Sequence, residues 1–436
     1  MRNIDISANC VFFIASIAAL GGILFGYDTA VISGTTSIVA DQFRLTELSK
    51  GWYVGCALIG SILGVAVAGL LSDFLGRKKT MLLSALMFSI SAIGCAVCNT
   101  FTELVVYRII GGFGIGVVSI VSPVYISEVS PAEKRGIMVS QYQLAVTIGF
   151  LLAYMFNYFI LKGADEALSA PSLASRMFNS EYWRGMLGLE AIPDLLFLIL
   201  VFFIPESPRW LAVRDTRRSN NEEWKCLREP GILKAVFIGS AIAILGQFMG
   251  VNAVLYYGPD IFQNAGISSE GSLFSTVLVG VVNMLTTFIA LLIIDKVGRK
   301  QLVWWGVSGM IICLVSIGAY FAWGVQIGLS AGFLLTSFLL YIFCTAISIS
   351  AVVFVLLSEM YPNRVRGLAM SIAGLALWVG TYLIGQLTPW MLEYLTPAGT
   401  FFFFAFMCLP YLYIMWKYVP DTTGKTLEEI EEYWKK

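Results

Sequence analysis

The chain has 436 residues, of which 58% are hydrophobic and 13% are charged, and its 28 Lys and Arg residues balance 28 Asp and Glu residues. A water-soluble chain usually carries about 25% charged residues, so this composition cannot cover a globular surface in water and indicates a membrane protein. A net charge of zero provides no basic surface for nucleic acid. The absence of histidine excludes His-based catalytic triads, His metal sites and imidazole proton relays.

The eight cysteines lie almost all in apolar runs, where we expect them to pack as small side chains. Cys95 and Cys98 have the spacing of a metal-binding pair, but they lie in an apolar stretch without a second pair of ligands. No segment resembles a nucleophile elbow or a phosphate-binding loop. The sequence therefore predicts no enzymatic activity, no bound metal and no cofactor.

Twelve apolar stretches of roughly 20 residues follow one another, each long enough to cross a hydrocarbon core of about 30 Å as a helix. They run over 10–33, 51–72, 80–98, 103–127, 138–161, 185–204, 232–263, 272–294, 301–323, 330–358, 367–391 and 397–419. A strand of a membrane barrel needs only about 10 alternating residues, so these stretches favour helices. The first stretch lacks a small-residue cleavage site and is long enough to be retained as a span. We expect an all-α membrane protein with twelve transmembrane helices.

Lys and Arg residues are distributed unevenly over the breaks between these spans. The even-numbered breaks and the C-terminal tail carry 21 of them, whereas the opposite side carries 5. Because basic loops stay in the cytoplasm, this pattern places both termini there. The predicted location is the cell membrane, inner or plasma, which the chain crosses many times.

Two motifs occur twice, in the same order. The string DFLGRK at 73–78 recurs as DKVGRK at 295–300, and the pattern Ser-Glu-x-x-Pro-x-x-x-Arg-Gly at 127–136 recurs at 358–367. Such a duplication predicts two six-helix halves, and transporters built in this way bind the substrate near the bilayer midplane between the halves. The predicted parts are an N-terminal half at 1–204, a polar cytoplasmic linker at 205–231, and a C-terminal half with a cytoplasmic tail at 232–436.

Acidic and basic residues gather in each half at the helix ends on the predicted cytoplasmic side. They are Asp73, Arg77, Glu128 and Arg135 in the first half and Asp295, Arg299, Glu359 and Arg366 in the second. Helix capping explains part of this set. The rest is expected to form a cytoplasmic gate of inter-helix ion pairs that hold the two halves together while the cavity faces out. An exposed pair contributes at most about 1 kcal/mol, but a network can bias a two-state equilibrium with a gap of a few kcal/mol.

Several strings resemble the sugar porters of the major facilitator superfamily, a family with bacterial xylose:proton symporters and facilitative glucose transporters. The matching strings are GGILFGYDTAVISG at 21–34, RIIGG at 108–112, PESPRWL at 205–211, QFMGVNAVLYY at 247–257 and PDTTGKT at 420–426. The resemblance covers the whole chain and implies the major facilitator fold, with two pseudo-symmetric halves that transport a sugar by alternating access. The family's cytoplasmic helical domain is usually longer than the stretch 212–231, so we expect a shortened linker.

Asp28 lies in the first span, where a charge at the helix centre costs about 2.5–3.5 kcal/mol, so we expect it to have a function and a partner. Arg108 in the fourth span is the candidate partner. Beside Arg108 the acid stays ionised, whereas separation in a dry site favours a proton, and this exchange would couple protonation to the conformational change. The resemblance agrees, because symporters of the family keep an acid here and facilitators generally have an amide. A static buried ion pair is the alternative.

Glu190 and Asp194 form a second acidic set in span six, four residues apart on either side of Pro193. Two interpretations remain open for them. They form an auxiliary proton site, with Glu190 as its candidate, or they line a wet vestibule near the outer face.

A sugar is a ring of hydroxyl groups with apolar faces, so its site needs amides for the hydroxyls and aromatic rings to stack on the sugar. By resemblance, the substrate-binding residues are Phe25, Gln143, Gln247, Asn252, Tyr256, Tyr257, Asn283, Phe354 and Trp378. Gln247, Asn252 and Tyr256 fall roughly on one side of a helix. That helix should be loosened or broken by Gly246, Gly250, Gly258 and Pro259. Amides that join helices explain any one of these residues but not the cluster.

Several cavity positions depart from the family. The first of two paired glutamines is Gly246, a stacking tryptophan is Phe354, the glutamine before Trp378 is Leu377, a Gly-Pro hinge reads Ser350-Ala351, and a glutamine of span five is Phe150. An unpaired polar partner costs roughly 1–3 kcal/mol, so two or three such losses are enough to abolish affinity for xylose or glucose. Either the ligand has fewer hydroxyls or more apolar surface than a free pentose, or the chain has been altered from its parent at this site.

The leading hypothesis is a proton-coupled symporter of a monosaccharide or a related small polyol-like solute. One alternative is an uncoupled sugar facilitator, in which Asp28 and Arg108 are structural. The other is a sugar-sensing receptor without transport, although the stretch 212–231 and the brief tail offer little surface for a partner. We expect a monomer whose partners are the sugar or sugar-like substrate, the proton and the lipid bilayer, and no nucleic acid.

Overall fold

The computed structural model describes residues 8–131, 135–164, 175–213, 229–324, 326–361, 365–420 and 434. Over these residues the secondary structure is helical, and twelve spans are long and apolar enough to cross a membrane. The predicted all-α membrane fold with twelve spans is thereby confirmed. Most of the predicted linker and most of the C-terminal tail lie outside the described residues, as do the side chains at positions 135, 295 and 354.

The chain divides into two compact units. The first comprises residues 1–43 and 56–217, and the second comprises residues 44–55 and 218–436. The change from one unit to the other at 217–218 falls within the predicted linker. Residues 44–55 precede most of the first unit in sequence, yet they pack with the second.

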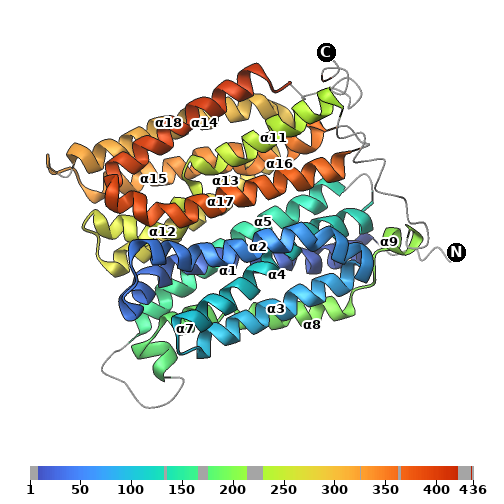
Figure 1. Ribbon diagram of the computed structural model, residues 1–436, viewed down its shortest axis with the longest axis horizontal. Coiled ribbons are helices and arrows are strands. Elements are labelled where there is room, and N and C mark those ends of the chain that lie inside the picture. Colours follow the sequence, from blue (N-terminus) through green and yellow to red (C-terminus); the bar gives the residue numbers. More distant parts are fainter. Residues whose placement is uncertain are drawn as a thin grey trace. The chain divides into compact units, whose positions relative to one another are not determined.

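The first unit contains six spans that the sequence analysis expected (Figure 1). Its helices are α1 (Ala8–Phe43), the larger part of α2 (Glu47–Leu75), α3 (Arg77–Val97), α4 (Phe101–Val129), α5 (Arg135–Gly163), a π-helical turn (Arg176–Ser180), α7 (Trp183–Gly188), α8 (Ala191–Phe203) and α9 (Pro208–Val213). Helix α1 packs along α5 and α4, and α3 lies beside α4 and α8. This arrangement brings the buried faces of α1, α4 and α8 together.

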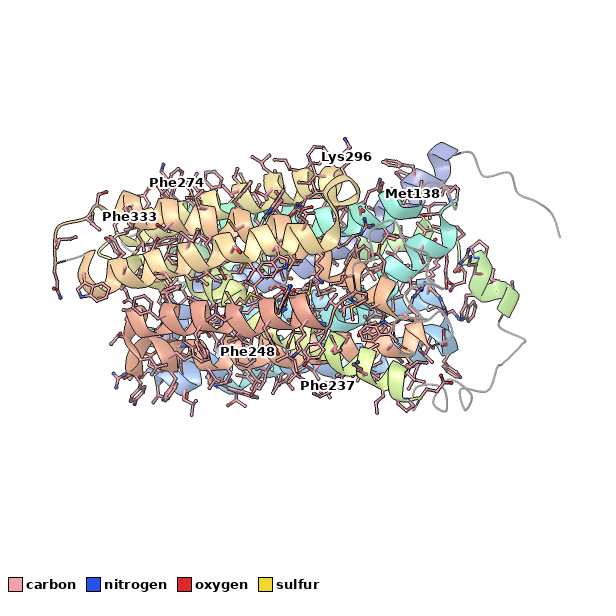
Figure 2. The ribbon with its side chains drawn as sticks, turned by 90° about the horizontal axis from the view of Figure 1, so that it is seen from above. Met138, Phe237, Phe248, Phe274, Lys296 and Phe333 are labelled. Carbon is pink, nitrogen blue, oxygen red and sulfur yellow. The ribbon has the colours of Figure 1, made fainter. Side chains whose placement is uncertain are left out.

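The second unit contains the other six spans. Its helices are α11 (Pro230–Phe248), α12 (Val251–Asn264), α13 (Ser269–Val297), α14 (Arg299–Ala319), a π-helical turn (Tyr320–Gly324), α15 (Ala331–Thr345), a second π-helical turn (Ala346–Ser350), α16 (Ala351–Met360), α17 (Arg366–Tyr394) and α18 (Thr396–Lys417). Helix α11 packs along α17, and α14 packs along α18 and α15. The exposed surface is apolar, as Phe237 on α11 and Phe274 on α13 illustrate at 75% and 48% exposed (Figure 2).

Helix α1 is longer than the sequence predicted, since it continues ten residues past the expected end at position 33 and finishes at Phe43. The extension is rich in hydroxyl side chains, which usually weaken a helix by competing for backbone groups. Here the hydroxyls of Thr35 and Thr36 donate to the carbonyl of Ile32, at 3.0 and 2.6 Å. Because these polar groups are satisfied within the helix, the span does not have to end where the apolar run ends.

Among the described residues, spans six, seven and ten are interrupted near their middles. Span six breaks between α7 and α8, and span seven breaks between α11 and α12, where Gly250 adopts a left-handed φ of 89°. The break at Gly250 confirms the expectation from sequence. Span ten contains the π-helical turn Ala346–Ser350, at the place where the Gly-Pro hinge is missing. Irregular backbone inside a membrane span is tolerated only where it is buried in protein or lines a cavity, which makes these breaks candidate parts of a site.

The duplicated string of the sequence folds in the same way in both units. Gly76 joins α2 to α3 with φ 97° and ψ 160°, and Gly298 joins α13 to α14 with φ 96° and ψ 145°. Only glycine adopts such angles without strain. The repeated motif therefore places Arg77 and Arg299 at the same position, the first residue of the following helix.

Helices α2 and α4 approach closely through glycines. A Cβ atom added to Gly60 would lie 2.2 Å from the carbonyl oxygen of Ile109, and one added to Gly112 would lie 1.9 Å from that of Ala57. Small residues allow such close approach at the interfaces of membrane helices.

We predict that Gly60→Ala lowers the midpoint of thermal unfolding, because the new methyl group overpacks the interface at a cost of about 1–3 kcal/mol. Gly69→Ala on the same helix is the matched control, since a Cβ at Gly69 meets nothing within 4 Å. Alanine favours a helix over glycine by about 1 kcal/mol, so the control should be neutral or stabilising. Equal destabilisation by both variants in purified protein would contradict the close approach.

Candidate functional site

A buried ion pair joins α1 to α4 in the first unit. Nη1 of Arg108 donates to Oδ1 of Asp28, and the two residues are 3% and 1% exposed. The prediction that Arg108 is the partner of Asp28 is confirmed. The remaining oxygen, Oδ2 of Asp28, has no hydrogen-bond partner among the described residues. A charge-assisted pair in this setting is held by its own attraction and depends on both members staying charged.

Two further carboxyl groups lie on α8 beside this pair. Glu190 precedes the first residue of α8 and is 3% exposed, and Asp194 in its first turn is 0% exposed. Asp28 is close enough to act electrostatically on both of them. This burial favours the interpretation of an auxiliary proton site over that of a wet vestibule near the outer face.

A second cluster lies at the junction of α2 and α3, at the end of the first unit that carries Arg77. The guanidinium of Arg77 donates to both carboxylate oxygens of Glu128 on α4, with Nε···Oε2 at 3.1 Å and Nη2···Oε1 at 3.0 Å. Its Nη1 donates to Asp73 at 2.8 Å. The side chains of Arg77 and Glu128 are 13% and 12% exposed, whereas that of Asp73 is 74% exposed. The bond to Glu128 is therefore the better shielded of the two.

Two members of this cluster were not predicted from the sequence. Oε1 of Glu206 accepts from the backbone N–H groups of Arg77 and Lys78, at 3.0 and 3.1 Å, and so caps the start of α3. The hydroxyl of Ser207 donates to Glu128. Both residues belong to the string at 205–211 that resembles the family, but nothing in the string indicates which distant helix ends it would bind.

The second unit has a corresponding pair between α14 and α16. Nη2 of Arg299 lies 3.1 Å from Oε1 of Glu359. Arg366 donates from Nε and Nη2 to the backbone carbonyl of Tyr361, both at 3.3 Å. Separately, burial raises the pKa of the Tyr361 phenol above its ordinary value. The side chains of Arg135 and Asp295, also predicted for this gate, lie outside the described residues.

The ion pairs described at this gate run within a unit, whereas the sequence analysis expected pairs between the halves. The physical reason is local. The turns at Gly76 and Gly298 place each arginine at the start of a helix, beside the end of a neighbouring helix that carries the glutamate. Each pair therefore fixes helix ends inside its own unit.

A polar cluster in the second unit surrounds the break between α11 and α12. Oε1 of Gln247 accepts from Nδ2 of Asn252 at 2.6 Å and from the hydroxyl of Thr381 at 3.1 Å. Thr381 lies on α17 and was not predicted. It follows Trp378 by about one helical turn, and this spacing was the only sequence signal for it.

Most of the remaining predicted sugar-binding residues are buried in one unit or the other. Tyr256, Tyr257, Asn283 and Trp378 are 2%, 1%, 9% and 7% exposed, and the hydroxyl of Tyr257 donates to the carbonyl of Gly385 at 2.6 Å. Phe25 on α1 and Gln143 on α5 are half-buried in the first unit. The side chain of Phe354 lies outside the described residues. Gly246 faces Ile349 and Tyr411, with room for a Cβ at 3.7 and 3.8 Å.

The first turns of α2, which belong to the second unit, carry a further ion pair that the sequence analysis did not predict. Nζ of Lys50 lies 2.7 Å from Oδ2 of Asp260 on α12, and both side chains are largely buried. Nearby, Nε2 of Gln386 on α17 donates to the carbonyl of Leu48 at 3.0 Å. These bonds hold residues 44–55 against α12 and α17.

Comparisons with known proteins agree with this architecture. The family model described as "Sugar (and other) transporter" matches residues 14–223 and 212–434. The D-xylose-proton symporter of Escherichia coli (strain K12) is 36% identical over 492 aligned positions, and the alignment covers 99% of this chain and 97% of that protein. The arabinose-proton symporter of Bacillus subtilis (strain 168) is 35% identical, with 98% and 96% covered. The inward open structure of the xylose transporter XylE from E. coli superimposes with a TM-score of 0.82 at 37% identity, with 97% and 100% covered.

The fold and the buried charges define a multi-pass membrane transporter of the major facilitator type, not an enzyme. The chain belongs to the sugar transporter family. The resemblance stated from the sequence strings is thereby confirmed.

We predict that Glu128→Gln destabilises the first unit more than Asp73→Asn, although both acids bind Arg77. Loss of Glu128 leaves a shielded guanidinium without its bidentate partner, at a cost of about 1–3 kcal/mol, whereas an exposed acid contributes within about 0.5 kcal/mol. Thermal unfolding of the purified variants measures the difference. An equal or larger effect of Asp73→Asn would show that Arg77 does not depend on Glu128.

Proposed function

We propose that the chain carries a monosaccharide, or a related small polyol-like solute, across the membrane together with a proton by alternating access. The single observation that supports this most is the ion pair between Asp28 and Arg108, buried inside a membrane-spanning unit. The relatives named as proton symporters of xylose and of arabinose support the same reaction.

In this proposal Asp28 is the group that takes up the transported proton. While Arg108 lies beside it, the guanidinium compensates the carboxylate where water does not reach. Protonation of Asp28 removes that attraction, so Arg108 must find another partner or water. A conformation that provides such a partner is then favoured, and a solute that binds this conformation more tightly shifts the equilibrium further. Proton and solute thus act on the same two-state equilibrium.

The polar cluster at Gln247 is the proposed solute contact in the second unit. Asn252 and Thr381 hold the amide of Gln247 in one orientation, and a group fixed in advance loses less entropy when it binds a ligand. Trp378, about one turn from Thr381 on α17, supplies an aromatic face for a sugar ring. Gly246, Phe354 and Leu377 stand where the family resemblance leads us to expect two amides and a tryptophan. The proposed site therefore offers a sugar fewer hydrogen bonds, and we expect it to bind free pentoses and hexoses weakly.

The proposed orientation places both termini and the two arginine clusters in the cytoplasm. It rests on the excess of Lys and Arg on one side of the spans. The clusters of Arg77 with Glu128 and of Arg299 with Glu359 then hold the cytoplasmic helix ends of each unit in a fixed arrangement. In the proposed cycle each unit moves as a body, and these bonds keep its helix ends together during the movement.

We predict that Asp28→Asn abolishes uphill uptake in proteoliposomes. A membrane potential of 100 mV supplies about 2.3 kcal/mol per charge, which supports roughly 40-fold accumulation of a solute moved with one proton. The wild-type chain should accumulate at least one of D-xylose, L-arabinose and D-glucose and acidify the lumen when that sugar is added. Asp41→Asn, an exposed acid on the same helix, should behave as the wild type.

Accumulation that survives in Asp28→Asn would contradict the coupling role. Sugar exchange without any uphill uptake, in the wild-type chain as in the variant, would favour an uncoupled facilitator. Sugar binding without exchange in either protein would favour a receptor.

We predict that Gln247→Ala weakens sugar binding about 10-fold to 150-fold, because the hydroxyl it serves loses a partner worth roughly 1–3 kcal/mol. Gln386→Ala is the matched control, since Gln386 binds the carbonyl of Leu48 instead of the Gln247 cluster. The shift of the unfolding midpoint with D-xylose, L-arabinose or D-glucose measures binding in both variants. A sugar-dependent shift that Gln247→Ala leaves unchanged would remove Gln247 from the site.

A further inference from the structure

Asp194 on α8 is the most completely buried acid of the first unit that the ion pairs do not use. It is 0% exposed, and neither of its carboxylate oxygens has a hydrogen-bond partner within the described part of the chain. Oε1 of the neighbouring Glu190 is also unpartnered there. An ionised carboxylate in such a place carries the full cost of desolvation without compensation.

The orientation of α8 shows that Asp194 faces protein. Ile192, Leu195 and Ile199 on the same helix are 66%, 43% and 56% exposed, as expected for side chains that face lipid. The opposite face of α8 packs against α1 and α3. Asp194 lies on that inner face, so its carboxyl group is directed into the unit that contains the Asp28–Arg108 pair.

The groups that interact electrostatically with Asp194 are Tyr27 and Asp28 on α1 and Glu190 at the start of α8. Arg108 on α4 joins this set through its ion pair with Asp28. Within the described residues this set contains three carboxyl groups and one guanidinium. If the three carboxyl groups and the guanidinium were all ionised, they would carry two uncompensated negative charges, whereas two bound protons make them neutral together. Because Arg108 already compensates Asp28, those protons belong on Glu190 and Asp194.

We propose that Asp194 is a second proton-binding residue of this site and that it holds an exchangeable proton while Asp28 is paired with Arg108. The proposal deepens the proposed proton coupling and rests on it for its role in transport, but the bound proton itself is measurable without a sugar. The break between α7 and α8 at Leu189 and Glu190 lies directly before this acid. Irregular backbone within a span is tolerated only where it is buried in protein or lines a water-filled cavity, so the proposal assigns the exchange of this proton with water to the break.

Infrared spectroscopy of the purified full-length chain tests the proposal, because only a protonated carboxyl group shows the carbonyl stretching band of an undissociated acid. At neutral pH the wild-type chain should show such a band, and Asp194→Asn should lose part of it. Asp41→Asn, which removes an exposed acid, should leave it unchanged. Because a substituted chain can fail to fold, the wild-type chain labelled with ¹³C-aspartate provides a second measurement, in which the band of a protonated aspartic acid shifts and that of Glu190 does not. Transfer to D₂O should shift the same band.

A band that is insensitive both to Asp194→Asn and to aspartate labelling would overturn the proposal. A labelled band that does not shift in D₂O would overturn the exchange of its proton. Neither result depends on sugar transport, so a chain that transports no sugar with protons would contradict the proposed function and leave this test intact.

Discussion

The cost of a charge in a hydrocarbon layer is the constraint on which the rest of this structure depends. Asp28 and Arg108 are both nearly inaccessible, and each is tolerated there because the other compensates it. Such a pair is a poor way to stabilise a membrane protein, because apolar side chains of similar size would avoid the desolvation cost. A pair that can be broken by one proton is instead a good way to make the stability of a conformation depend on protonation.

In the proposed cycle each unit moves as a body, and the remaining features suit such a movement. The glycine contacts between α2 and α4 and the cluster around Arg77 join helices within the first unit. The breaks at Gly250 and between α7 and α8 provide local freedom next to polar side chains. Rigid helix ends and interrupted helix centres together are what alternating access requires of a scaffold. Glu190 and Asp194 place two further buried carboxyl groups next to one of these breaks.

The sequence predicted what depends on local pattern and on a single strong cost. Twelve apolar runs gave the spans, the isolated acid at Asp28 required a cation such as Arg108, and Gly250 predicted the break in span seven. Contacts set by tertiary packing could not be predicted. Thr381 and Glu206 are ordinary polar residues until another helix approaches them, and the length of α1 depends on hydroxyl bonds inside the helix. The local string of each gate motif likewise did not reveal that its ion pairs stay within one unit.

The contact between the guanidinium of Arg108 and the carboxyl group of Asp28 is the most direct test of the account. Solid-state NMR of the chain in lipid, with ¹⁵N-labelled arginine and ¹³C-labelled aspartate, measures their dipolar coupling against pH. Arg108→Lys and Asp28→Asn samples assign the signal. We predict a strong coupling at high pH that disappears at low pH when a transported sugar is present. A coupling of the same strength under both conditions would contradict it, because the pair would then be a static element of the fold.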